Sequence, residues 1–434
     1  MDSTNLKRLP EQNFIKQPNR IIIILLALFF SIHSLYAQNE KELSDFLHSG
    51  TVKTKVASVK VPIVIWNDFI LLKVKVNGND ATFMWDNGFS YSGIDNSLVQ
   101  PYKLVPFKKD SETIMIDGNN TEIKNIDFLM CPQFELRGIK VTNTPFVKLD
   151  FRAFTTSEDL KIEGAIGSSI INKLNWKFDF DNKYVEISEK PFNINNNDLV
   201  LPFKIKDNNT HSMPIAFDDN TAECAIDFGY NSDVISINTI NAKLFYKANA
   251  TKTFGPHSIS LSGVAPQDTI YTIKDNFTWE LSGKKLNVNP RISFTKSTEN
   301  VVVGNKLFRN SYNVIINTSC DTVYALSPRK KAAVKKNDNA YGYKLYNVNG
   351  KFKIMSIECN ANTVDSDIKL FDEVISINGK VAADFEDNYA LREYQKELLD
   401  KQKKMVLKFK DGKEILLTPQ PGIEYKFKNE KELW

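Results

Sequence analysis

The sequence has few of the residues that build metal centres. Its 434 residues include only four cysteines and four histidines. The cysteines contain no C-x-x-C pair, and the histidines show no spacing that is typical of zinc ligands. We therefore expect no metal site and no cofactor. No pattern supports a catalytic pair of histidine with serine or cysteine either.

The four cysteines, Cys131, Cys224, Cys320 and Cys359, leave two interpretations open. In an exported protein, Cys224 and Cys320 could form a disulfide. Alternatively, all four are small buried apolar side chains, as free cysteines commonly are.

The sequence also lacks a strong excess of charge and a basic stripe with interleaved aromatic residues. The formal net charge is +4, with 42% hydrophobic and 25% charged residues. This composition is typical of a globular protein with several hydrophobic cores. It disfavours nucleic acid as a partner, because proteins that bind nucleic acid concentrate lysine and arginine on one surface.

Only one long apolar run is present, IIIILLALFFSI at residues 21–32. It follows basic residues and precedes the small residue Ala37, which is the pattern of a signal peptide with its cleavage point. We predict a signal peptide over 1–37, export to the periplasm or out of the cell, and no membrane span in the mature chain. The alternative is a membrane anchor, but the run is short for a span, which needs about 20 residues.

A short motif in the first third of the chain raises the main functional question. Residues 83–95, FMWDNGFSYSGID, place Asp86 directly after three large apolar side chains. A carboxylate in that position is costly unless it is hydrogen-bonded, paired or used in chemistry. Residues 223–236, ECAIDFGYNSDVIS, repeat the pattern around Asp227. The doubled Asp-x-Gly is therefore the candidate site.

The same landmarks surround both aspartates. Each follows a strand, a turn and a second apolar strand, at 72–85 and at 214–226. Each is followed much later by an apolar step that ends in glycine, at Gly167 and Gly304. The aspartates are 141 residues apart and these glycines 137. Because convincing helices are scarce in this region, apart from a short one near 168–174, the repeat predicts two mostly β units.

With these motifs, residues 56–328 resemble an aspartic peptidase of the retropepsin-like kind, with two lobes in one chain as in pepsin. The resemblance implies a mainly β fold and a polypeptide substrate, and we expect a monomer. It also implies that Asp86 and Asp227 form a dyad that shares a proton. One carboxylate then activates water, while the protonated one polarises the scissile carbonyl. The residues implied to support the active-site loops are Asn87, Gly88, Phe228, Gly229, Gly167 and Gly304.

The family closes hairpin flaps over the bound peptide, and residues 113–123 and 255–263 are the candidates here. The surroundings of the aspartates depart from the family. Threonine or serine usually follows the aspartate, and its hydroxyl bonds across to the opposite loop. Here Asn87 can still donate and accept, but Phe228 has no polar group. Large rings, Phe89 and Tyr230, follow the glycines. The alternative function is therefore an inactive protein that binds peptide on the same fold.

The C-terminal part predicts a compact α+β domain. Its expected strands are 351–358, 373–379, 405–409 and 414–418, with a helix over 388–402. It resembles a PDZ domain of the kind fused to exported bacterial proteases. That resemblance places a loop that binds a peptide carboxylate at Tyr341, Gly342 and Tyr343. Asp367 and Phe371 stand where the family usually has glycine. The alternative is a small domain that only caps the second lobe.

The predicted domain plan assigns the whole chain. Its parts are a signal peptide (1–37), an N-terminal linker (38–55), two aspartyl protease-like lobes (56–195 and 196–328), a basic linker (329–340) and a PDZ-like domain (341–434). The basic linker is expected to be a solvated spacer, as charge runs usually are, although a binding patch is the alternative.

Overall fold

A computed structural model gives the structure of most of the chain after residue 44. The described residues are 45–110, 114–151, 161–218, 220–256, 259–273, 275, 277–288, 290–296, 298, 300–319, 321–330, 339–364 and 366–428. The chain divides into two units, Met1–Ser49 and Gly50–Trp434. The predicted signal peptide, Cys320 and most of the predicted basic linker lie outside the described residues. Within the described part, no helix is long and apolar enough to cross a membrane.

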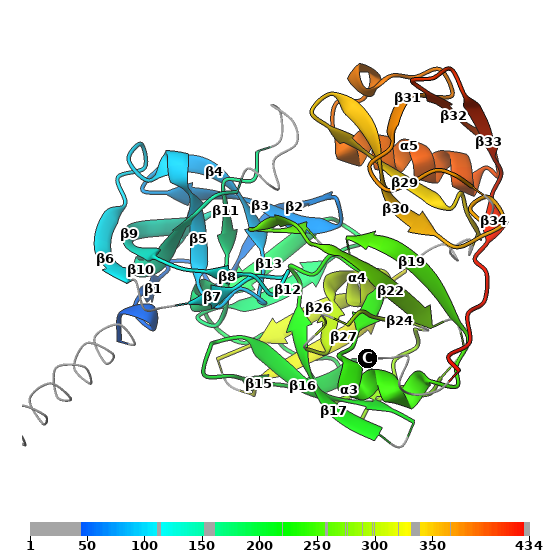
Figure 1. Cartoon of the computed structure of the whole chain (residues 1–434). Helices are drawn as coiled ribbons and strands as arrows, with labels where there is room; N and C mark the ends of the chain where they lie inside the picture. The colour runs from blue at the N-terminus through cyan, green and yellow to red at the C-terminus, as the bar shows by residue number, and fades with distance from the viewer. Residues whose placement is uncertain are drawn as a thin grey trace, which may run out of the picture. The chain divides into compact units, whose positions relative to one another are not determined.

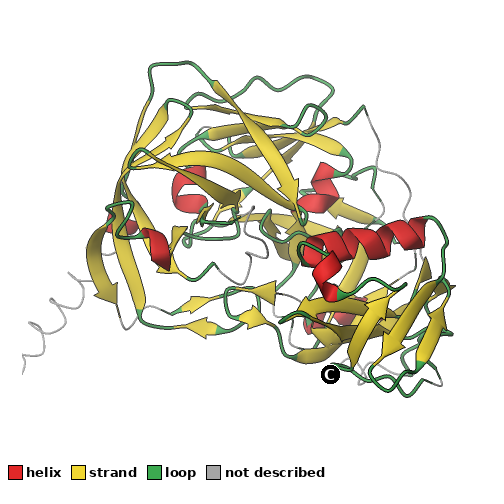
Figure 2. Cartoon of the chain, turned by 90° about the horizontal axis from the view of Figure 1, so that it is seen from above, coloured by secondary structure: helices red, strands yellow, loops and turns green. Residues whose placement is uncertain are grey.

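The fold of the second unit is mainly β, which confirms the predicted class (Figure 2). We call residues 51–188 the first repeat. Its elements are β1 (Thr51–Lys53), β2 (Val59–Trp66), β3 (Phe69–Val76), β4 (Asn79–Trp85), β5 (Ser92–Asp95), η1 (Asn96–Leu98), β6 (Val105–Asp110), β7 (Met115–Ile116), β8 (Glu122–Ile123), β9 (Ile126–Leu136), β10 (Ile139–Leu149), β11 (Gly164–Ile166), α2 (Ser168–Ile171), β12 (Asn175–Asp179) and β13 (Tyr184–Ser188).

Residues 199–328 form the second repeat. Its elements are β14 (Leu199–Pro202), β15 (Lys204–Ile205), β16 (His211–Phe217), β17 (Asn220–Asp227), β18 (Val234–Ser236), α3 (Thr239–Ala242), η3 (Lys243–Phe245), β19 (Ala250–Pro256), β20 (Ile259–Ser260), β21 (Gly263–Val264), β22 (Gln267–Ile273), β23 (Trp279–Leu281), β24 (Arg291–Phe294), β25 (Val302–Gly304), α4 (Asn305–Arg309), β26 (Tyr312–Asn317) and β27 (Val323–Pro328).

Residues 339–421 form the C-terminal module. Its elements are β28 (Asn339–Ala340), β29 (Tyr343–Val348), β30 (Lys351–Glu358), β31 (Glu373–Ile377), η4 (Ala382–Asp384), α5 (Asn388–Asp400), β32 (Met405–Phe409), β33 (Glu414–Leu417) and β34 (Gln420–Pro421).

The two repeats share one pattern of strand pairing around their aspartates. In the first, β11 lies parallel to β4 and antiparallel to β5, and β5 is parallel to β10. In the second, β25 lies parallel to β17 and antiparallel to β18, and β18 is parallel to β24. A short helix, α2 or α4, follows the middle strand each time. The strand that ends at each aspartate is therefore flanked by the later glycine-terminated strand.

A sheet shared by both repeats joins them. It runs in the order β14-β27-β26-β12-β13-β2, and strand β12 of the first repeat pairs antiparallel with β26 of the second. Trp176 faces Ile316 and Phe178 faces Val314 in this register. One apolar cluster extends through both repeats. The carboxylates are thus carried by loops on a continuous core.

The C-terminal module has its own apolar core and follows the predicted pattern closely. Strands β30 and β32 have the predicted bounds, and α5 starts at the predicted residue. Asp387 caps α5 by accepting a bond from Ala390 N (2.7 Å). Leu391 and Leu398 of α5 are buried in the module's apolar core, and α5 lies beside the module's strands (Figure 1). Phe371, which stands where the PDZ resemblance predicts a glycine, has a φ of +70°, a backbone conformation that favours glycine.

Two connections tie the C-terminal module to the second repeat. Strand β30 pairs antiparallel with β19, with Phe254 opposite Ile357. The chain after β34 then returns along the second repeat (Figure 1), where Tyr425 and Ala250 exchange two backbone hydrogen bonds of 2.7 and 3.0 Å. The ring of Phe427 is buried against Tyr271. The module is therefore an extension of the second repeat's sheet.

Candidate active site

The two candidate aspartates stand at equivalent points of the doubled pairing pattern. Asp86 directly follows β4, and its N–H donates to Ile166 O of β11 (3.0 Å). Asp227 is the last residue of β17 and lies opposite Gly304 of β25. Each carboxylate therefore begins a loop held by an inner strand that has neighbours on both sides.

The structure brings these two aspartates together. The two carboxyl groups lie close enough to interact electrostatically. A Cβ atom on Gly88 would lie 2.3 Å from Cγ of Asp227, and one on Gly229 would lie 2.4 Å from Cγ of Asp86. Each carboxyl group thus rests on the glycine of the opposite loop. Only glycine leaves room for this approach.

Each loop also holds its own aspartate through backbone N–H groups. Oδ1 of Asp86 accepts bonds from Gly88 N (3.0 Å) and Phe89 N (3.1 Å). Oδ1 of Asp227 accepts the corresponding bond from Tyr230 N (3.0 Å). These donors fix the direction of both carboxyl groups, so the dyad is oriented before any ligand arrives.

The pKa values of both aspartates are raised, as expected for two buried carboxyl groups that lie close together. Burial and then the neighbouring Asp227 raise the pKa of Asp86 well above its usual value of 3.8. Burial also raises the pKa of Asp227, but the backbone donors of its loop oppose that rise. Two carboxyl groups this close do not both ionise readily, so the pair holds one shared proton over a range of pH.

Asn87 makes the contact across the loops that a hydroxyl makes in the resembling family. Its Nδ2 donates to Ile226 O (2.8 Å), and its Oδ1 accepts from Phe228 N (2.8 Å). These two backbone groups lie on either side of Asp227. The side chain is fully buried. Asn87 thus holds the backbone of the opposite loop on both sides of Asp227.

Phe228 does not return that contact with its side chain. Its ring is fully buried, lies edge-on to Trp85 (centroids 5.2 Å apart) and stacks on Phe308 (5.7 Å). Aromatic packing therefore takes the place of the second hydroxyl. The ring fills the interior behind the loops and not the space before the carboxyl groups.

The large rings after the two glycines are each held by their own repeat. A Cβ on Gly93 would lie 3.1 Å from the Phe89 ring, which places this ring beside β5. A Cβ on Gly304 would lie 2.9 Å from the Tyr230 ring, which places this ring beside β25. Both anchors lie within the ring's own repeat.

Gly167 and Gly304 were predicted to support the active-site loops. Each packs against the backbone of the loop that carries the aspartate of its own repeat. A Cβ on Gly167 would lie 1.3 Å from Tyr91 O, and one on Gly304 would lie 2.3 Å from Tyr230 O. Both positions therefore require glycine because the backbones touch.

Sequence reasoning missed the residue that follows each of these glycines. Ser168 Oγ donates to Asn87 O (2.9 Å), and Asn305 Nδ2 donates to Phe228 O (2.7 Å). The two side chains hold equivalent carbonyl groups in the two loops. Their equal offset from the repeated glycines was the signal that could have identified them.

Sequence reasoning also missed a buried polar group behind Asn87. Tyr324, His211 and Asn172 continue its hydrogen bonds into the second repeat and back to the first. His211 is fully buried, and burial lowers its pKa to about 3. No spacing in the sequence relates these residues.

The predicted flap regions both form hairpins, and their tips meet. The first flap is β7–β8 and the second is β20–β21. Gly118 N donates to Ser260 Oγ (2.9 Å), and Ser262 N donates to Asp117 Oδ2 (2.8 Å). The two hairpins are thus joined in this structure.

Comparison with known families agrees with the first repeat. Residues 72–170 match the aspartyl protease family model. The matched segment carries Asp86, Asn87, Gly88 and Gly167, and it spans under a quarter of the chain. Among curated proteins, none matches the chain. The aspartyl protease resemblance is therefore supported by sequence for the first repeat, and the second repeat is related to it through the shared pairing pattern.

An ion cluster links the aspartyl protease-like first repeat to both other parts. The Asp68 carboxylate pairs with Lys306 (2.7 Å), Arg309 (2.6 Å) and Arg392 of α5 (3.6 Å). Burial alone would raise the pKa of Asp68, but these three cations outweigh it, so this pKa is lowered. Asn305, which holds the second loop, also donates to Asp68 O (3.1 Å).

The predicted carboxylate-binding loop of the C-terminal module is largely internal. Tyr341 and Tyr343 are buried in the module's core, and Tyr341 Oη donates to Lys403 O (2.5 Å). Gly342 between them has a φ of +86°, which favours glycine. The two tyrosines therefore contribute packing.

The edge of β29 beside this loop is occupied by side chains of α5. Gln395 bonds to both the N–H and the carbonyl of Leu345 (3.3 and 3.2 Å). Asn388 bonds to both groups of Asn347 (2.6 and 3.0 Å). Each amide side chain reproduces the bonds that a neighbouring strand would make.

The cysteine prediction holds for two residues and is wrong for a third. Cys131 and Cys224 are buried, and burial raises the pKa of both, that of Cys131 to about 12. Cys359 is exposed, because it leaves the sheet just after β30 ends. Cys320 lies outside the described residues, but Cys224 is a free cysteine, which contradicts the alternative of a Cys224–Cys320 disulfide. The described part holds no cluster of residues that could bind a metal.

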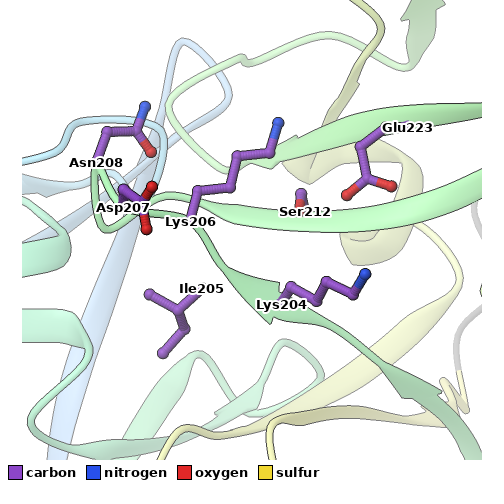
Figure 3. A pocket seen from close by; sticks show the side chains of 7 residues that line it. All are labelled: Lys204, Ile205, Lys206, Asp207, Asn208, Ser212 and Glu223. Carbon is purple, nitrogen blue, oxygen red and sulfur yellow. The ribbon is translucent and has the colours of Figure 1, made fainter.

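A cavity of about 460 Å³ lies over the β15–β16 hairpin (Figure 3). Its lining residues are Lys204, Ile205, Lys206, Asp207, Asn208, Ser212 and Glu223. The lining mixes both signs of charge and includes no residue of either aspartate loop. We therefore give this cavity no role in the chemistry of the dyad.

Proposed function

We propose that the protein is an exported aspartic peptidase with two lobes, one for each repeat. The observation that carries this proposal is the close approach of Asp86 and Asp227, each of whose carboxyl groups rests on the glycine of the other's loop. A pair of carboxyl groups that share one proton is the acid–base unit of peptide hydrolysis by bound water.

The two carboxyl groups take different roles in this proposal. The Asp227 carboxylate removes a proton from water as the water oxygen attacks the scissile carbonyl carbon. Asp86, whose pKa is raised further, donates its proton to the carbonyl oxygen. When the tetrahedral intermediate collapses, the C–N bond breaks, the proton on Asp227 passes to the leaving nitrogen, and one hydroxyl of the intermediate returns a proton to Asp86. The joined flaps would have to part to admit the polypeptide.

The C-terminal module is proposed to be PDZ-like and to recruit polypeptide. Its strand order and the position of α5 support this assignment. A peptide that added to the edge of β29 would replace the bonds of Gln395 and Asn388. Recruitment by strand addition would therefore require α5 to release these side chains. The apolar run at 21–32 supports export to the periplasm or beyond.

Turnover of denatured proteins or a peptide library between about pH 3 and 7 tests the catalytic proposal, with the range taken from the acid–base role of the pair. We expect cleavage by the wild type and a loss of at least a hundredfold in Asp86→Asn and in Asp227→Asn, since positioned acid–base groups contribute about that much. Asp80→Asn is the matched control, because Asp80 is exposed in the same strand and pairs only with Lys75 among the described residues. Equal activity in all four chains would refute the mechanism. Absence of cleavage by the wild type would favour the inactive peptide-binding alternative.

A further inference from the structure

A chain of buried hydrogen bonds runs from the first aspartate loop through the second repeat and back. Asn87 Nδ2 lies 2.9 Å from Tyr324 Oη, and Tyr324 Oη lies 2.7 Å from His211 Nδ1. His211 Nε2 lies 2.7 Å from Asn172 Oδ1, and Asn172 Nδ2 donates to Asn209 O (2.8 Å). Asn87 and His211 are fully buried and Tyr324 is too.

Counting donors and acceptors gives this chain one direction. Asn87 Nδ2 has two hydrogens: one goes to Ile226 O, and the other goes to Tyr324 Oη (2.9 Å), which is nearer than the other candidate acceptor, His211 Nδ1 (3.2 Å). The Tyr324 hydroxyl must then donate to Nδ1 of His211. The imidazole is therefore neutral with its proton on Nε2, which donates to Asn172 Oδ1. In this chain, Tyr324 Oη donates to His211, and His211 Nε2 donates to Asn172.

This direction matters because an amide can turn over. If the Asn87 amide rotated by half a turn, Oδ1 would face Ile226 O and Nδ2 would face Phe228 N. Two attractive contacts would become repulsive. Ile226 O and Phe228 N therefore set the orientation, and Tyr324 Oη holds the amide in place by accepting its second Nδ2 hydrogen, which it can do while its own proton goes to His211.

We propose that Tyr324 and His211 are positioning residues that act through Asn87 to fix the loop carrying Asp227. The proposal rests on the proposed function of the dyad. A threonine hydroxyl at residue 87 would rotate freely to satisfy both loop contacts and would need no such partners. The ring of Phe228 gives no return contact, so this one amide carries the polar link from the first loop's side chain.

A double-mutant cycle separates positioning from ordinary stabilisation. We expect Tyr324→Phe to lower kcat at least tenfold with little change in KM, because a misplaced catalytic group loses up to about a hundredfold in rate. In the Asn87→Thr background, the same change should lower kcat by less than about threefold, since the acceptor is no longer needed. Equal losses in both backgrounds would overturn the proposal.

Tyr312→Phe is the matched control for the loss of a partly buried tyrosine bond. Tyr312 lies in β26, in the sheet that joins the two repeats and also contains Tyr324. Its hydroxyl accepts a hydrogen bond from Asn287 N (2.8 Å). It should reduce stability without lowering kcat. His211→Phe should reproduce the kcat loss of Tyr324→Phe and show the same suppression by Asn87→Thr. A kcat loss in His211→Phe that Asn87→Thr leaves unchanged would contradict the positioning role.

A readout without substrate keeps this inference separate from the proposed function. The pH dependence of the unfolding free energy is measured for each chain and for the same chain with Asp86→Asn. Their difference reports how closely the two carboxyl groups interact. Tyr324→Phe should shrink this difference in the Asn87 chain but not in the Asn87→Thr chain. If turnover is absent everywhere, the proposed function fails while this difference still decides the inference. An unchanged difference would refute it.

Discussion

The loops that carry Asp86 and Asp227 begin from the same strand pattern but are held in different ways. The first loop extends a polar side chain, Asn87, across to the backbone of the second. The second loop offers only its backbone, while the ring of Phe228 packs against Trp85 and the interior. The two loops are therefore joined by two different kinds of contact. We call the hydrogen bonds of Asn87 the polar half and the packing of Phe228 the apolar half. Position of the carboxylates and stability of the core then depend on different residues.

The largest effect on stability is expected from the apolar half. Phe228→Ala should lower the unfolding free energy by about 3 to 5 kcal/mol, because it empties a fully buried aromatic site. Asn87→Ala should cost about 1 to 3 kcal/mol, the range for leaving buried polar partners unpaired. Denaturant unfolding measures both, and Phe107→Ala is an exposed control. A larger loss in Asn87→Ala than in Phe228→Ala would contradict this division.

The polar half should make stability depend on pH. The pKa of His211 is lowered to about 3 by burial, below the usual 6.5 of the unfolded state. Between these values the unfolded chain binds the extra proton, so the unfolding free energy falls as the pH falls. From pH 6.5 to 4, this residue should remove about 3 kcal/mol of stability.

Urea unfolding of the wild type and of His211→Phe at several pH values measures this contribution, which should be missing from the variant. An NMR titration of the wild type gives a second measurement if the variant does not fold. Protonation of the His211 ring above pH 5 would contradict this prediction, because it would show that His211 is accessible to water.

The two aspartates should also differ from each other. Because the folded-state pKa of Asp86 is raised, its stabilising contribution is present below about pH 4 and is lost as the pH rises through the folded value. Asp86→Asn should therefore gain stability relative to wild type from pH 4 to pH 7. Asp227→Asn should gain less, since its pKa is raised less. Thermal unfolding at the two pH values measures this, and the reverse order would exchange the assigned roles.

The two flap hairpins also differ, because the base of the second flap contacts the C-terminal module. The strand β19 at the base of the second flap pairs with β30 of the C-terminal module, and Gly255 allows this approach. A Cβ there would lie 2.6 Å from Met355 O. Gly255→Ala should detach the pair and increase hydrogen exchange at both flap tips several-fold, because the tips bond to each other.

Gly138→Ala is the control for this last prediction. Gly138, in the turn between β9 and β10, also has a positive φ, of +101°, but a Cβ there would meet open space. It changes the backbone preference without touching β30. Equal exchange at residues 115–123 in the two variants would show that the module does not restrain the flaps.

Local patterns in the sequence were sufficient to predict many of the elements. The alternation in KFKIMSIE predicted β30 with its actual bounds, since strand period and turn residues are encoded within a few positions. The paired aspartates were also predicted, because the repeat shows two copies of one local motif. Both inferences use residues that are close in sequence.

Contacts between distant residues were not predictable in the same way. Asn87 was expected to keep some polar role, but its partners Tyr324 and His211 lie more than a hundred residues away. The exposure of Cys359 depends on where β30 ends, and the pairing of β30 with β19 depends on a shared sheet edge. Such features are set by tertiary packing, which a single sequence without a repeat of the motif does not display.

The return of the chain after β34 has a consequence for the order of folding. Tyr425 pairs with Ala250, and Phe427 lies against Tyr271 and Phe294. The second repeat therefore completes its apolar core only after residue 427 has been synthesised, more than a hundred residues after β25. The strands around Asp227 are all present once residue 304 has been made, but the apolar packing on Tyr271 and Phe294 is complete only after the C-terminal module has followed.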